Sequence, residues 1–199
     1  MAAETADRIV VATNELFRRQ GYNGTSLSQI SKASEATIGS IYHFFPGGKE
    51  ALAVAVIDTT GSVYRELFES IADAADDLAT GFQDVFTGAA AVLEETDFID
   101  PCPIGTVARE AANTNEPLRA AADRAFDSWV DAAAGRLRAL GVDERGAKEL
   151  ATMFVATLEG CFVLSRTKRS TEPLRVAGRH VADLAARAIA AADPARADG

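Results

Sequence analysis

Apolar side chains recur at helical spacing along most of this chain, so that they fall on one face of each stretch. No segment alternates apolar and polar residues for long enough to predict a β-strand, and the 199 residues include only six prolines. The pattern therefore predicts an all-α protein. The expected helices span roughly 3–19, 26–33, 37–45, 49–73, 78–94, 104–113, 115–140, 143–168 and 173–189.

Two short helices joined by a tight turn are expected between residues 22 and 49. Ser26 and Gln29 have the spacing of a capping box, in which each residue satisfies a backbone N–H group of the helix start. Residues 34–36 would form the turn, and the Thr37 hydroxyl can cap the second helix. Two helices connected in this way form a helix-turn-helix, whose second helix contacts DNA bases.

Four short motifs carry a family resemblance. They are S-I-Y-H-F-F at 40–45, K-E-A-L at 49–52, F-P-G-G-K-E at 45–50, and C-P-I-G-T-V-A-R-E-A at 102–111. The first two resemble the DNA-binding domain of TetR-family transcriptional regulators, and the last two are similar to the LmrA/YxaF-like branch of that family. The resemblance covers roughly the first quarter of the chain and the one later segment.

The resemblance implies an N-terminal three-helix DNA-binding head at residues 1–48. A helical body for effector binding and dimerisation would follow at residues 49–199. The helix that starts at Lys49 would begin in the head and end in the body, so that its movement would move the head.

The resemblance also implies a set of DNA contacts on the two short helices. Ile38 could meet a thymine methyl group, Tyr42 and His43 would reach phosphates, and Lys49 would bring a charge to the backbone. The alternative is a solvated helix surface with small polar caps. The expected contact residues are Ser28, Thr37, Ile38, Gly39, Ser40, Tyr42, His43 and Lys49.

Two positions depart from the family pattern. Family members usually have glycine where this chain has Glu35, and often lysine, arginine or glutamine where it has Ile38. A carboxylate near phosphate is repulsive, and a non-glycine residue costs about 1 kcal/mol if its φ must be positive. These departures bear on affinity and operator preference and leave the expected fold unchanged.

The formal net charge of −9 lies outside the expected head. Residues 1–50 hold five basic and five acidic side chains, whereas the remaining residues hold 15 basic and 24 acidic ones. Because salt screens charges over about 8–10 Å, this distribution is compatible with DNA binding. Modest nonspecific DNA affinity is expected.

The segment from Met153 to Leu164 is apolar on nearly all sides. Such a helix must be covered on every side, which predicts a homodimer through the last two helices. Aromatic and apolar residues of the body could line an effector pocket or form plain core. The candidates are Phe82, Phe86, Cys102, Ile104, Val107, Phe126, Trp129, Phe154, Leu158 and Phe162.

The sequence offers no catalytic or metal-binding motif, so neither an enzyme nor a cofactor is expected. Cys102 and Cys161 match no metal or redox spacing and are expected to be free thiols. Without a signal sequence or a long apolar run, a soluble cytoplasmic protein is expected. The resulting hypothesis is a ligand-responsive repressor that binds a palindromic operator as a dimer and is released by a small lipophilic effector. The alternative is a helical small-molecule-binding protein without specific DNA recognition.

Overall fold

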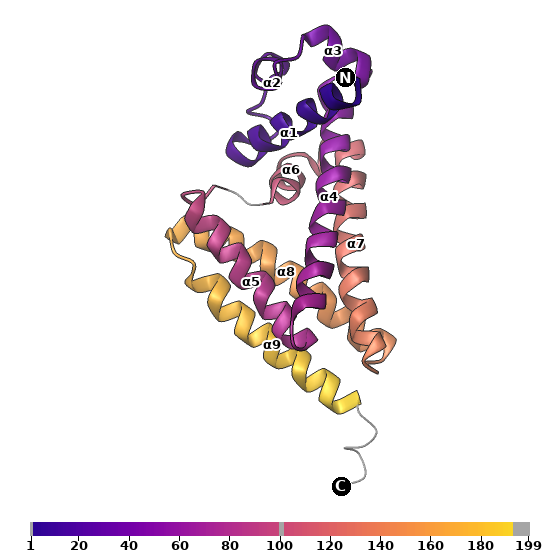
Figure 1. Cartoon of the computed structure of the whole chain (residues 1–199), viewed down its shortest axis with the longest axis vertical. Helices are drawn as coiled ribbons and strands as arrows, with labels where there is room; N and C mark the ends of the chain where they lie inside the picture. The colour runs from indigo at the N-terminus through magenta and orange to yellow at the C-terminus, as the bar shows by residue number, and fades with distance from the viewer. Residues whose placement is uncertain (1, 100–101, 193–199) are drawn as a thin grey trace. The chain divides into compact units, whose positions relative to one another are not determined.

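The computed structural model describes residues 2–99 and 102–192, and within these ranges the chain forms nine α-helices and no strand (Figure 1). The all-α prediction is therefore confirmed, and the expected helix ends agree with the observed ones to within a few residues. The helices are α1 (Ala2–Gln20), α2 (Leu27–Ser34), α3 (Ile38–Phe44), α4 (Lys49–Ala74), α5 (Leu78–Glu95), α6 (Pro103–Ala111), α7 (Glu116–Ala139), α8 (Glu144–Lys168) and α9 (Glu172–Ala192).

The chain divides into two compact units. Unit 1 comprises Met1–Ser62 with Cys102–Ala125, and unit 2 comprises Val63–Pro101 with Phe126–Gly199. Helices α4 and α7 each begin in unit 1 and end in unit 2. Unit 1 thus contains the whole of the expected head together with α6, and the functional division at residue 48 stays a prediction.

The core of unit 1 is built from one or two large apolar side chains per helix. Helices α2 and α3 have eight and seven residues, which is too short to be stable without packing. Each buries one isoleucine completely, and the longer helices supply the surrounding side chains. The fully buried large residues of the first four helices are Ile9, Phe17, Ile30, Ile41, Leu52 and Ile57.

Aromatic side chains form the core of unit 2. Phe82 of α5 and Phe154 of α8 stack with ring centroids 4.6 Å apart, and Phe68 and Phe86 pack against the same Phe154 ring. Helices α5 and α9 approach closely at Gly178, where an added Cβ would lie 2.8 Å from the Cβ of Phe86. A side chain at residue 178 would therefore push α9 away from α5.

Candidate functional site

The start of α2 is fixed by a capping box, as the sequence predicts. The Ser26 hydroxyl accepts a hydrogen bond from the Gln29 N–H at 3.3 Å, and the Gln29 side chain accepts one from the Ser26 N–H at 2.8 Å. The backbone N–H groups of Ser26 and Gln29, at the start of α2, are thereby hydrogen-bonded without solvent. The cap sets the direction in which α2 leaves the preceding loop.

The turn between α2 and α3 contains a non-glycine residue in a left-handed conformation. Glu35 has φ +52° and caps the end of α2, and its N–H donates to the Ser31 carbonyl. The Ser31 hydroxyl donates to the Ala36 carbonyl at 2.6 Å, which ties both sides of the turn together. Glu35 therefore occupies the conformation that glycine adopts most easily.

Helix α3 presents large side chains to solvent. Thr37 caps the helix by accepting from the Ser40 N–H at 3.0 Å, as predicted, and Ile41 is completely buried. Ile38 and Tyr42 remain 45% and 50% exposed. A seven-residue helix with one buried anchor and two exposed large side chains is suited to contact another molecule with its outer face.

The residues predicted to contact DNA lie mainly on this exposed face. Of the eight, Ser40 and Lys49 are partly buried and the others are exposed: Ser28, Thr37, Ile38, Gly39, Tyr42 and His43. The Ser40 hydroxyl lies 2.9 Å from the Thr37 hydroxyl, so the two hydroxyls share one hydrogen bond. Contact with DNA stays a prediction for all eight residues.

Lys49 has partners within the chain that sequence reasoning missed. Its Nζ donates to the carbonyl oxygens of Tyr22 and Thr25 at 3.1 and 3.0 Å, and it lies over the Tyr22 ring. Burial lowers the pKa of Lys49, and the nearby Glu110 carboxylate acts in the opposite direction. The ammonium group therefore anchors the α1–α2 loop in addition to any contact with DNA.

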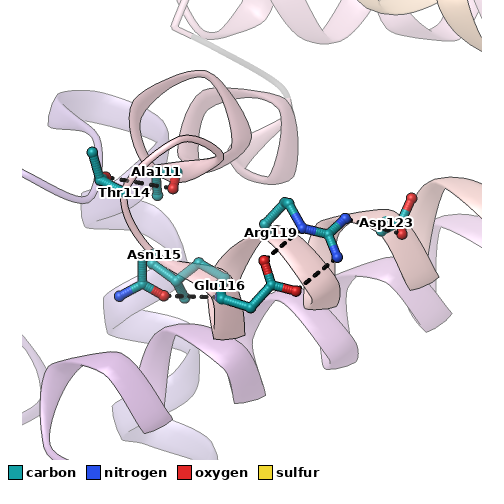
Figure 2. Close-up of polar contacts among 7 residues, drawn as sticks. Ala111, Thr114, Asn115, Glu116, Arg119 and Asp123 are labelled. Carbon is teal, nitrogen blue, oxygen red and sulfur yellow. Dashed lines mark hydrogen bonds and ion pairs between the residues drawn. The ribbon is translucent and has the colours of Figure 1, made fainter.

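The start of α7 lies against the start of α4. Asn115 caps α7, because its side-chain oxygen accepts from the Leu118 N–H at 2.9 Å (Figure 2). Its amide nitrogen donates to Glu50 at 2.6 Å. Figure 2 also shows Arg119 between Glu116 and Asp123 of its own helix. These contacts raise the pKa of Arg119 above its ordinary value and leave its charge unchanged at neutral pH.

The ten residues predicted to line an effector pocket belong to both units. Phe82 and Phe86 both pack against Phe154 in unit 2, and Phe126 meets Trp129 edge to face with ring centroids 5.4 Å apart. Cys102, Ile104 and Val107 are buried in unit 1, and Leu158 and Phe162 belong to unit 2. Their role in effector binding stays a prediction.

A surface hollow of about 150 Å³ lies beside one of these residues. It is formed by α5 and α9 within unit 2, and Phe86 contributes to its lining with Thr87 and Arg179. Among the residues that the structure describes, no three His, Cys, Asp or Glu side chains are grouped so that they could hold a metal ion. Within the same residues, no helix has the length and apolar character needed to cross a membrane.

Two family models match different parts of the chain. The model described as "Bacterial regulatory proteins, tetR family" matches residues 9–56. The model described as "Transcriptional regulator LmrA/YxaF-like, C-terminal domain" matches residues 79–180. The first match contains the helix-turn-helix, and the second extends from α5 into α9.

Two relatives that match this chain over most of their length agree with these family models. YxaF of Bacillus subtilis (strain 168), an uncharacterized HTH-type transcriptional regulator, is 35% identical over 171 residues, which are 86% of this chain and 90% of YxaF. The HTH-type transcriptional regulator LmrA of the same strain is 36% identical over 86% of this chain and 91% of LmrA.

Among solved structures, the reduced form of Escherichia coli NemR superimposes with a TM-score of 0.79 at 22% identity, over 89% of this chain and 94% of NemR. A TetR transcriptional regulator from Chloroflexus aurantiacus gives a TM-score of 0.75 at 31% identity, over 92% of this chain and 94% of that chain. The chain therefore belongs to the TetR family of DNA-binding transcriptional regulators, in its LmrA/YxaF-like branch, and is not an enzyme.

Proposed function

We propose that this protein is a repressor that binds a palindromic operator as a homodimer and is released by a small lipophilic effector. The observation that carries the proposal is the outer face of α3, where Ile38 and Tyr42 are exposed while Ile41 anchors the helix. Ile38 suits contact with a thymine methyl group, and Tyr42 and His43 suit contact with phosphates.

Exposed residues of α8 support a dimer. One side of the helix is buried within unit 2, including Phe154, Cys161 and Phe162. The other side leaves Val163 and Leu164 44% and 51% exposed, with exposed Ala156 and Gly160 beside them. A second copy packed on this side would bury these residues, and a dimer of this kind matches a palindromic operator.

Gly160, an exposed glycine inside α8, also supports the dimer. A Cβ built at this residue would meet no atom within 4 Å, so packing within the chain does not require glycine here. Glycine inside a helix costs about 1 kcal/mol relative to alanine. Close approach of a second helix would offset this cost.

Release from DNA would follow if the effector bound the DNA-binding state and a non-DNA-binding state of the protein with different affinities. Helices α4 and α7 each run from unit 1 into unit 2, so a change in either helix reaches both units. An effector that binds the non-DNA-binding state more tightly would shift the population toward it. The apolar and aromatic character of the ten candidate pocket residues favours a lipophilic effector.

The alternative remains a helical small-molecule-binding protein without specific DNA recognition. The observation that favours it is Glu35, an exposed carboxylate in the turn that leads into α3. At this place the carboxylate would repel a nearby phosphate.

A gel-shift experiment with the DNA upstream of this protein's own gene tests the proposal. We expect a discrete shift that a scrambled duplex of equal length does not show. Ile38→Ala should weaken the shift several-fold, because an exposed apolar contact is removed. Val11→Ala is a matched control, since Val11 is an exposed aliphatic residue of α1, outside the helix-turn-helix. Equal binding of both duplexes by the parent protein would favour the alternative.

A further inference from the structure

Glu110, near the end of α6, reaches a backbone group in the loop between α1 and α2. Its Oε2 accepts a hydrogen bond from the Asn23 N–H at 2.8 Å, although the two residues are 87 positions apart. Both residues belong to unit 1. The contact is charge-assisted, and such hydrogen bonds are stronger than those between neutral groups.

Gly21 makes room for this carboxylate. A Cβ at this residue would lie 1.9 Å from Oε1 of Glu110, far inside van der Waals contact. Gly21 also has φ +75°, and its N–H donates to the Phe17 carbonyl at the end of α1. The end of α1 therefore combines a left-handed glycine with the close approach of an acidic side chain.

The other side of the same loop is held by a basic side chain. Lys49 donates to the carbonyl oxygens of Tyr22 and Thr25, while Glu110 accepts from the Asn23 N–H. A cation from α4 thus binds two carbonyl groups of the loop, and an anion from α6 binds one of its N–H groups. Residue 26, which caps α2, follows directly on this loop.

We propose that Glu110 is a positioning residue for the DNA-contacting helices: by holding the Asn23 N–H, it fixes the loop from which α2 starts. Glu110 is the glutamate of the C-P-I-G-T-V-A-R-E-A segment at 102–111. Its effect on DNA affinity rests on the proposed function, whereas its effect on the loop does not.

The test compares two substitutions of similar size and equal charge, Glu110→Gln and Glu110→Met. Glutamine keeps an oxygen that can accept from the Asn23 N–H, whereas methionine does not. In hydrogen-exchange NMR, Glu110→Met should speed exchange of the Asn23 amide by about tenfold or more. Glu110→Gln should restore most of the protection, and the amide of Ile57, which is buried in α4, serves as an internal reference for global stability.

Glu116→Ala is the control for loss of a surface carboxylate. Glu116 is exposed and is bonded to Arg119 of its own helix, so its removal should leave Asn23 exchange as in the parent. Unchanged Asn23 exchange in Glu110→Met would overturn the proposal, as would equal acceleration in Glu110→Gln. This readout needs no DNA, so it remains decisive even if the parent protein binds none.

The second readout is the affinity for a labelled duplex of the DNA upstream of the protein's own gene. Glu110→Met should bind several-fold more weakly than Glu110→Gln, with the same dependence on salt, because residue 110 acts through the loop. Equal affinity of the two variants, with Asn23 exchange still changed, would overturn the positioning role and leave a purely structural one. A parent protein that fails to bind the duplex would count against the proposed function and not against the loop contact.

Discussion

Lys49 binds the backbone of the α1–α2 loop and covers the Tyr22 ring at the same time. Its Nζ lies 4.1 Å from the centroid of the Tyr22 ring and donates to the carbonyl oxygens of Tyr22 and Thr25. The ammonium group therefore makes two hydrogen bonds and a cation–π contact at the same time. The first residue of α4 thus stabilises the loop that precedes α2.

Lys49→Met should lower the free energy of unfolding by about 1–2 kcal/mol, because two charge-assisted hydrogen bonds at a partly exposed position are lost. Urea denaturation followed by circular dichroism measures the change. Lys32→Met is the matched control, since Lys32 is an exposed lysine on α2. Equal loss of stability in both variants would mean that the loop contacts of Lys49 contribute nothing measurable.

The same variant tests the predicted phosphate contact of Lys49. If the ammonium group also binds a phosphate, Lys49→Met should weaken binding to operator and nonoperator DNA alike. The plot of log affinity against log salt concentration should then become less steep, with the magnitude of its slope lower by about one. Tyr22→Leu keeps the charge and should keep the slope. A loss of affinity without a change in slope would assign Lys49 to holding the loop and not to phosphate.

Local signals in the sequence predicted the parts of the site that depend on neighbouring residues. The caps at Ser26, Thr37 and Asn115 were predictable because each bonds a backbone N–H three residues further along the chain. The contact of Glu110 with Asn23 was not predictable, because it depends on how α6 packs in unit 1. No periodicity in either segment indicates that the two residues meet.

In the body, the sequence likewise could not show which apolar residues would be buried. Periodicity identified α8 as apolar on nearly all sides but could not separate the buried Phe154 and Phe162 from the exposed Val163 and Leu164. That separation is made by α5 and α9, which pack on one side of the helix. For the same reason, the sequence could not tell that Phe82 and Phe86 would pack against Phe154.

Gly160→Glu should dissociate the proposed dimer. Within one chain a new side chain at this residue meets open space, so the variant should fold, but a charge buried between two copies would be unpaired. Light scattering at micromolar concentration measures the mass. Gly88→Glu is the matched control, because Gly88 is also helical and exposed, and a Cβ added there would likewise meet no atom within 4 Å. A single-chain mass for the parent protein would contradict the proposal directly.

Cys161 should make the protein less stable at alkaline pH. Burial raises the pKa of the Cys161 thiol. A group whose pKa is higher in the folded state stabilises that state below its unfolded pKa, and the contribution is lost as pH rises. Between about pH 8 and pH 10, the parent should therefore lose more stability than Cys161→Ala.

Urea midpoints of each protein at the two ends of this pH range give the comparison. The loss of stability caused by the smaller alanine side chain is the same at both pH values, so it cancels when each protein is compared with itself. Identical losses in both proteins would show that the thiol of Cys161 makes no contribution to the pH dependence.

Glu35→Gly should raise the melting temperature. Glu35 has φ +52°, and relief of a left-handed non-glycine conformation is worth about 1 kcal/mol, or roughly 2–4 °C for a chain of this size. The N–H bond to Ser31 is a backbone contact and is kept by glycine. Glu35→Ala removes the same charge but keeps a Cβ in the left-handed conformation, so its melting temperature should not rise.

The pair of variants at Glu35 separates strain from charge in DNA binding. If the carboxylate lies near a phosphate, both Glu35→Gly and Glu35→Ala should bind operator DNA several-fold more tightly at low salt. This gain corresponds to about 1 kcal/mol for one exposed like-charge contact, and it should shrink as salt rises because the charges are screened. Fluorescence anisotropy across a salt series measures both affinities. A gain for Glu35→Gly alone would assign the effect to the turn conformation, and no gain for either variant would place the carboxylate away from phosphate.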